Sequence, residues 1–243
     1  MKANTKSHAG LWIIAYMLVF SFSQQAALLF AVNQIMKKEH LSFEAATQLV
    51  SVSHTPLVLA LSALIGLPLL FMIIRWRNLS WSNMVFQKPM RFQRLLILFF
   101  LGIGLNFLAS VFLYFVQLIP GLSAWFEAYQ QSMKGMLPQS DPRQLIILLG
   151  IIVPIYEEVL FRGLVFRELA TTIPIKWAIV AQALLFGFWH STFIQGAYAF
   201  VLALLLGRLY LRYHSIAAAC AVHCGFNTAT YLWIFVVNGL LMN

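Results

Sequence analysis

Two adjacent glutamates, Glu157 and Glu158, lie in the middle of a long apolar stretch, residues 144–169. The chain has only seven acidic residues, and a charge at bilayer depth is costly, so such a pair marks a functional site by default. Arg162 follows Glu158 by four positions, which places both side chains on one helical face in the order that favours an ion pair. Glu157 is rotated from that face by about 100°. The pattern predicts a Glu158–Arg162 pair beside a Glu157 carboxylate that can meet a substrate, a water molecule or a metal ion.

Three more polar side chains, His190, His223 and Asn227, lie in later apolar stretches. At about 1.5 Å per residue, the glutamates, His190 and Asn227 lie roughly 18 to 21 Å from the nearest basic end of their spans, and His223 roughly 12 Å. Helix tilt shifts each depth by several ångströms. We therefore expect one polar layer built from three spans and open toward the cytoplasmic side, with His190 or His223 within about 10 Å of Glu157.

Such a layer suits hydrolysis. Two neutral imidazoles with a carboxylate or amide oxygen can hold a zinc ion, while a second carboxylate takes a proton from the attacking water. The same groups could work without metal, with glutamate as the general base and histidine and asparagine holding the oxyanion. The commonest zinc-protease motif, His-Glu-x-x-His, is absent. The residues leave both variants open.

The composition indicates a membrane protein. Of the 243 residues, 61% are hydrophobic and only 9% are charged, whereas about a quarter of the residues in a soluble domain are charged. The net charge of +9 comes from short basic clusters between apolar stretches, which is typical of membrane topology. We therefore expect contact with lipid and no binding of nucleic acid. Cys220 and Cys224 are four apart in one apolar stretch, so no disulfide framework is implied.

The apolar stretches predict an all-α, polytopic membrane bundle of about seven to eight transmembrane helices. We expect one domain, 1–243, with a motif-bearing catalytic half, 144–239. Ser21, Ser23, Gln24 and Gln25 lie inside the first span and are expected to face other helices. Two short amphipathic segments are expected at the membrane surface, 41–49 and 122–133. Seven spans are predicted, at about 11–35, 56–74, 95–119, 144–169, 175–193, 196–213 and 216–237.

The basic residues predict the orientation. The loop after the second span carries five of them, from Arg75 to Arg94, and no acid. With the N-terminus inside, this loop lies on the same side as Arg167, Lys176 and Arg208. The positive-inside rule then predicts a multi-pass protein of the cell membrane with a cytoplasmic N-terminus.

The spacing of these polar residues resembles a known family. Three motifs occur in order on successive predicted helices: Glu157-Glu158-x-x-x-Arg162, Phe186-x-x-x-His190 and His223-x-x-x-Asn227. They resemble the motifs of the CAAX-processing endopeptidase and bacteriocin-processing family of intramembrane metalloproteases, also called the CPBP or Abi family. The resemblance covers about residues 154–230.

The resemblance implies an intramembrane endopeptidase. Glu157 would be the catalytic base, and Glu158 and Arg162 its structural and electrostatic support. His190, His223 and Asn227 would bind the metal or the oxyanion, and with Glu157 they form the expected ligand set for zinc. The expected substrates are lipidated protein tails or small peptides in the membrane, and bacteriocin processing or self-immunity is an expected role.

Two other classes of function fit parts of the pattern. A proton-coupled transporter could use Glu157 and His190 as a relay, although such proteins show repeated halves and this sequence has no internal repeat. A non-catalytic immunity or adaptor scaffold would keep the fold and bind a partner through it. The order of the three motifs favours the enzyme.

Overall fold

The computed structural model describes residues 8–80, 89–134 and 142–241. Within these ranges every regular element is helical, which confirms the predicted all-α class. In order, the helices are α1 (Ala9–Glu39), α2 (Phe43–Ser53), α3 (Thr55–Trp76), α5 (Phe92–Val116), α6 (Ser123–Lys134), α7 (Pro142–Ile147), η2 (Leu148–Ile152), α8 (Val153–Glu158), η3 (Val159–Val165), α9 (Phe166–Thr172), α10 (Ile175–Phe188), α11 (Phe193–Tyr213) and α12 (Ile216–Leu241).

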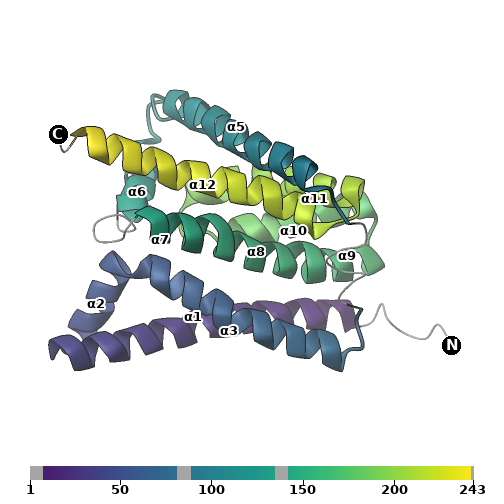
Figure 1. Cartoon of the computed structure of the whole chain (residues 1–243), viewed down its shortest axis with the longest axis horizontal. Coiled ribbons are helices and arrows are strands. Elements are labelled where there is room, and N and C mark those ends of the chain that lie inside the picture. The colour runs from purple at the N-terminus through teal and green to yellow at the C-terminus, as the bar shows by residue number, and fades with distance from the viewer. Residues whose placement is uncertain (1–7, 81–88, 135–141, 242–243) are drawn as a thin grey trace.

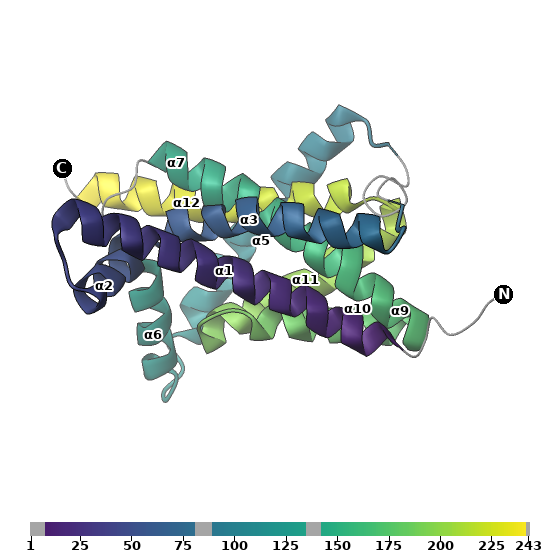
Figure 2. The same ribbon diagram turned by 90° about the horizontal axis from the view of Figure 1, so that it is seen from below.

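The first three helices form one side of the bundle. α1 and α3 pack along each other, and the short α2 joins them (Figure 1). Ser42 caps α2, because its hydroxyl accepts a hydrogen bond from the Ala45 N–H at 3.3 Å. This helix covers most of the predicted short segment 41–49, and its place at the membrane surface stays a prediction. The α1–α3 pair covers the central run from α7 to α9 (Figure 2).

The central run, residues Pro142 to Thr172, supplies the middle of the core. Tyr156, Leu160 and Leu164 are fully buried on it. They belong to one hydrophobic cluster with Phe20 of α1 and Phe186 of α10. The segment with the paired glutamates is therefore held by helices from both halves of the chain.

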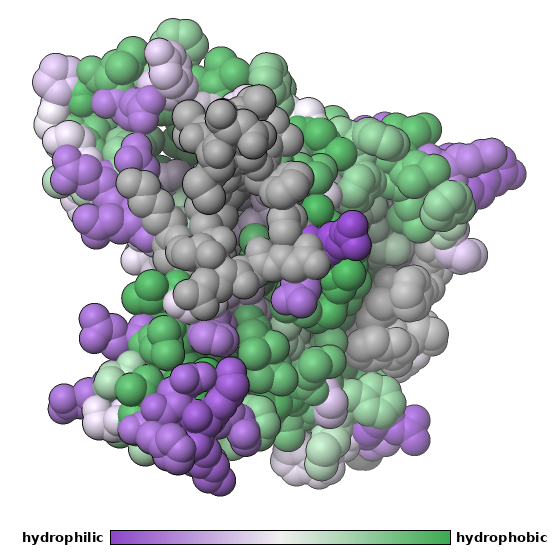
Figure 3. Space-filling view, turned by 60° about the vertical axis from the view of Figure 1, so that its left-hand side comes forward, coloured by the Kyte–Doolittle hydropathy of each residue, from purple (hydrophilic) through white to green (hydrophobic). Residues whose placement is uncertain are grey.

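Five helical segments among the described residues are long and apolar enough to cross a membrane: Ala9–Glu39, Thr55–Trp76, Phe92–Val116, Arg143–Thr172 and Phe193–Tyr213. The surface shows broad hydrophobic areas with hydrophilic side chains in separate groups (Figure 3). The protein is therefore a multi-pass membrane protein. The predicted fifth span, 175–193, is shorter than expected: α10 has 14 residues, and about 20 are needed to cross. α12 occupies the predicted seventh span, and a count of seven to eight crossings stays a prediction.

The two ends of the bundle differ in charge. At one end α3, α9 and α11 finish and α1, α5, α10 and α12 begin (Figure 1). This arginine-rich end holds Arg77, Arg94, Arg167, Arg208 and Arg212. The opposite end, which we call the α6 end, holds α2 and α6 (Figure 2). The fold thus gathers the basic residues that the topology prediction assigned to the cytoplasm, although the orientation in the membrane stays a prediction.

A glycine allows α5 to lie directly against α12. A Cβ atom on Gly225 would stand 1.9 Å from the Phe99 carbonyl oxygen, so only glycine permits this approach. Small residues at such contacts let transmembrane helices pack closely.

We predict that Gly225→Ala lowers the free energy of unfolding by about 1 to 3 kcal/mol, because the backbones must separate. Gly104→Ala on α5 is the matched control, since a Cβ there meets nothing within 4 Å. That change should be neutral or stabilising, because alanine favours helix. Unfolding of the detergent-solubilised protein measures both. Equal stability of the two variants would contradict the close contact.

Candidate active site

Irregular helical geometry sets the direction of the paired glutamates. Two π-helical stretches, η2 and η3, flank the short α8, which ends at Glu158. α8 has Pro154 in its first turn, and proline cannot donate the backbone hydrogen bond of a regular helix. Single π-helical turns inside α-helices are frequent at functional sites.

The predicted ion pair forms and is completely buried. Arg162 Nη1 donates to Glu158 Oε1 at 2.8 Å, and both side chains are 0% exposed. A buried pair needs further hydrogen bonds to offset the loss of water. Arg162 Nη2 donates to the Ala203 carbonyl at 3.3 Å, and Gln182 donates to the same oxygen at 3.2 Å. The pair therefore ties the central run to α10 and α11.

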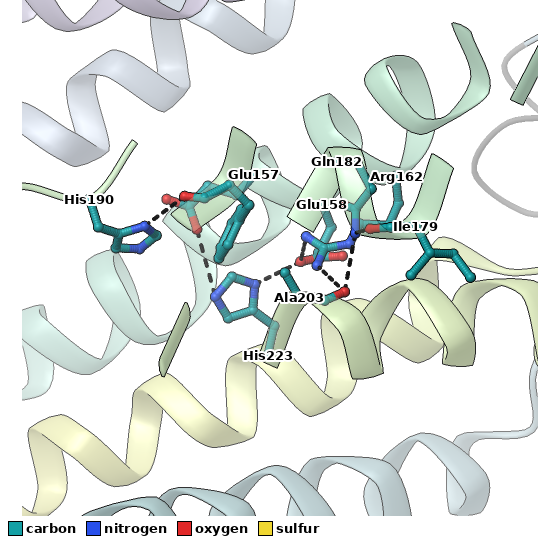
Figure 4. A network of polar contacts seen from close by, with 9 residues as sticks. Glu157, Glu158, Arg162, Ile179, Gln182, His190, Ala203 and His223 are labelled. Carbon is teal, nitrogen blue, oxygen red and sulfur yellow. Dashed lines mark hydrogen bonds and ion pairs between the residues drawn. The ribbon is translucent and has the colours of Figure 1, made fainter. Parts of the chain in front are cut away.

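Glu158 also positions a histidine. His223 Nδ1 lies 2.8 Å from Glu158 Oε1, the oxygen that Arg162 contacts (Figure 4). Because a carboxylate only accepts, Nδ1 carries the proton, and Nε2 is the lone-pair nitrogen of the neutral ring. That Nε2 lies 3.6 Å from Glu157 Oε2, too far for a direct hydrogen bond. His223 thus stands between the two glutamates and points its Nε2 to Glu157.

His190 lies in a tight turn instead of a helix. α10 ends at Phe188 and α11 begins at Phe193, and His190 Nδ1 donates to the Phe186 carbonyl at 2.9 Å. The turn depends on two glycines, since a Cβ on Gly187 would lie 2.8 Å from the Gly196 carbonyl oxygen. His190 therefore also keeps Nε2 as its acceptor nitrogen.

Asn227 lies one helical turn after His223 on α12. Its Nδ2 donates to the Leu149 carbonyl in η2 at 3.2 Å. This bond fixes the amide, and its Oδ1 remains the acceptor atom. Figure 4 draws the polar network around Glu157, Glu158, Arg162, His190 and His223.

Four of the predicted site residues line one cavity of about 570 Å³: Glu157, His190, His223 and Asn227. Glu158 and Arg162 lie behind it in the core. The expectation that His190 or His223 comes within about 10 Å of Glu157 is met by His223. The structure thus brings the three motifs together.

The cavity extends to the end of the bundle opposite to the one expected. Ser51 of α2, Thr55 of α3 and Gln131 of α6 line it, and all three lie at the α6 end. The prediction that the site opens toward the basic, cytoplasmic-assigned side is therefore wrong. At the arginine-rich end the helices are tied together by three side chains.

These three side chains are Tyr16, Arg77 and Glu168. Arg77 Nη1 contacts Glu168 Oε1 at 2.5 Å and also the Tyr16 hydroxyl, which itself donates to Glu168 at 3.2 Å. The cluster joins α1, the end of α3 and α9. Sequence reasoning missed it, although Glu168 is a further acid within the fourth span.

Two amides of α1 face the cavity of the candidate active site. Gln24 and Gln25 line it together with residues of other helices, and neither side chain makes a hydrogen bond within the described residues. They thus face other helices, as expected, across a cavity. Polar groups at membrane depth need water or a ligand. Phe20, one turn earlier, packs on Trp189 with ring centroids 5.0 Å apart, so these amides lie near the His190 turn.

Phe186 is a further residue whose importance the sequence did not reveal. Its ring lies 5.0 Å from the Arg162 guanidinium, and its centroid is 5.0 Å from that of His190 and 5.7 Å from that of His223. The motif Phe186-x-x-x-His190 assigned no role to Phe186 itself. Phe186 instead separates the buried ion pair from the cavity and orients both rings.

The predicted zinc ligands are side chains of kinds that bind metal ions, but they are not close enough together to share one ion. Among the described residues, no three His, Cys, Asp or Glu side chains lie close enough together to hold an ion. However, each histidine has its Nδ1 held by a second group, Glu158 or the Phe186 carbonyl. Metal-binding histidines almost always have such a partner. Cys220 and Cys224 are free thiols.

Residues 139–229 match the family model described as type II CAAX prenyl endopeptidase Rce1-like. Over these residues the chain is similar to that family. All six predicted site residues fall within this Rce1-like region, so the resemblance seen in the three motifs is confirmed. At the level of the family the match supports an intramembrane endopeptidase. Searches of curated proteins and of solved structures gave no match.

We predict that Arg162→Ala lowers the free energy of unfolding by about 3 to 5 kcal/mol, because it leaves Glu158 buried without its partner. Combining Glu158→Gln with Arg162→Met should recover part of this loss, since no charge is then buried. It should not restore full activity, because His223 loses its carboxylate partner. Thermal unfolding in detergent measures all three proteins. Wild-type stability of Arg162→Ala would rule out the buried pair.

Proposed function

We propose that this protein is an intramembrane endopeptidase in which Glu157 activates the water that attacks a peptide bond. The supporting observation is the position of Glu157. Its carboxylate lines the cavity and lies 3.6 Å from His223, whose orientation depends on the Glu158–Arg162 pair. A carboxylate in hydrogen-bonding reach of a bound water can act as a general base.

The residues suggest the following steps. A peptide enters the cavity from the α6 end, and Glu157 accepts a proton from a water molecule as its oxygen attacks the scissile carbonyl carbon. Glu157 then gives that proton to the leaving amine when the C–N bond breaks. Hydrolysis is thereby balanced, with one water consumed and no other reactant required.

The tautomers of the two histidines favour a metal-dependent version. With both Nδ1 protons engaged, neutral His190 and His223 offer lone pairs to the cavity, and a lone pair cannot donate to an oxyanion. We propose that Glu157, His190, His223 and Asn227 would hold zinc, which supplies a Lewis acid for the carbonyl oxygen and lowers the pKa of bound water. Their side chains would have to move closer together to do so.

The cavity wall supports a peptide as substrate. Uncharged amides from three helices line it, namely Gln24 and Gln25 of α1, Gln131 of α6 and Gln195 of α11. Such groups can hydrogen-bond a peptide backbone without requiring a charged partner. We propose a membrane-bound substrate, either a lipidated protein tail or a small peptide. The family resemblance also motivates a role in bacteriocin processing or self-immunity.

We predict that Glu157→Gln reduces peptide hydrolysis by about 100- to 10,000-fold and leaves the fold intact. Glutamine has nearly the shape of glutamate, but its amide cannot accept the proton. Turnover of a peptide and prenylated-peptide library by purified protein measures the loss. The control is Glu127→Gln on α6, which neutralises an exposed acid. Full hydrolysis by Glu157→Gln would leave a transporter or a scaffold as the better explanation.

We further predict that His190→Ala and His223→Ala lose bound zinc, because each removes a nitrogen ligand, whereas Glu157→Gln keeps most of it. His8→Ala, which alters an exposed histidine, is the control. Elemental analysis of the purified proteins measures zinc per chain, and it does not depend on activity. Zinc retained by both histidine variants would contradict the ligand set but not the role of Glu157.

A further inference from the structure

A second cavity, of about 600 Å³, lies at the arginine-rich end. It shares no described lining residue with the cavity of the candidate active site. Its position at the ends of α9, α10 and α11 places it where the apolar spans meet the aqueous boundary. Ligand sites typically occupy about 300 to 1,000 Å³, so this volume can hold a small polar group. The described residues that line it are Asn78, Ser80, Phe166, Arg167, Ala170, Thr171, Ile175, Tyr210, Leu211 and His214.

Arg167 is the charged group of this cavity. It is half-buried, and within the described residues it forms no ion pair or hydrogen bond. Arg77 and Arg162 behave differently, since each contacts a carboxylate. The nearest acid in sequence, Glu168, is already bound by Arg77. No Asp or Glu is among the described lining residues, so within the described part of the chain the positive charge of this cavity has no acidic partner.

Tyr210 provides a second hydrogen-bonding group. The residue is 9% exposed, its ring packs edge-on against Phe166 with centroids 5.7 Å apart, and it lines the cavity. The phenol has no hydrogen-bond partner among the described residues. The hydroxyl interacts electrostatically with Arg167, and it is not one of the fully buried atoms that lack a partner. It is therefore available to donate to a ligand with acceptor oxygens.

The walls indicate what kind of anion fits. Polar Asn78 and His214 stand exposed at the rim, while Phe166, Ile175 and Leu211 form an apolar wall. An apolar wall contributes nothing to the binding of an inorganic anion. A phospholipid, in contrast, has both a phosphate and acyl chains that can contact such a wall. Arginine binds phosphate through paired N–H donors, and basic pockets between transmembrane helices bind lipid headgroups. We propose that this cavity binds the phosphate-bearing headgroup of an anionic phospholipid, with Arg167 and Tyr210 as its principal donors.

The test uses full-length protein in neutral detergent. Native mass spectrometry measures binding of short-chain phosphatidylglycerol, with phosphatidylcholine and inorganic phosphate as separate arms. Wild type should bind phosphatidylglycerol best. Arg167→Gln should weaken that binding about tenfold or more, since it removes a charge-assisted hydrogen bond. Tyr210→Phe should weaken it less, because the ring packing is kept.

Arg208→Gln is the matched control. It removes the same charge from an exposed position at the same end, outside the lining of the cavity. The control should bind phosphatidylglycerol like wild type. An equal loss in Arg208→Gln and Arg167→Gln would mean general attraction to a basic surface, and would overturn the site.

The measurements with phosphatidylcholine and with inorganic phosphate also test the proposal. Equal binding of phosphatidylcholine would show that negative charge is not recognised, and binding of phosphate alone with the same affinity would identify a free-anion site. Either result would overturn the proposal. If Arg167→Gln does not fold, Tyr210→Phe decides, and unchanged lipid binding by that variant would count against the site.

Discussion

The buried pair of Glu158 and Arg162 is the interaction on which the candidate active site depends. An arginine and a glutamate that are both 0% exposed need further hydrogen bonds to offset the loss of water. Arg162 finds the Ala203 carbonyl on α11, and Glu158 finds His223 on α12. Three helices therefore converge on one charge pair. The orientation of His223 toward Glu157 is a consequence of that convergence.

Phe186 separates this pair from the cavity. Its ring contacts the Arg162 guanidinium on the core side and both histidine rings on the cavity side. The Phe186 ring shields the Glu158–Arg162 ion pair from water in the cavity. This shielding strengthens the pair, because electrostatic interactions weaken in water. Glu157, in contrast, lines the cavity. Two adjacent glutamates thus have different environments, and this difference assigns them different roles.

The two ends of the bundle differ in their polar contacts and in their cavities. At the arginine-rich end, Arg77, Glu168 and Tyr16 tie α1, α3 and α9 together. At the α6 end, Gln24 and Gln25 line the cavity of the candidate active site. In the proposed function a peptide enters from the α6 end, while the arginine-rich end has a separate cavity around Arg167. The proposed peptide entry and the proposed lipid site thus lie at opposite ends of the bundle.

The sequence by itself determined the features that depend on local spacing. The apolar stretches specify helices, and the four-residue interval specifies the Glu158–Arg162 pair, because neighbours on one helix meet in any fold that keeps the helix. The similar depths of His223 and Glu157 in their predicted membrane spans predicted that the two side chains come close together. The contacts of Arg162 with Ala203, the turn that holds His190 and the end at which the cavity opens were decided only by tertiary structure. They depend on how segments far apart in the chain pack, and no local pattern records that packing.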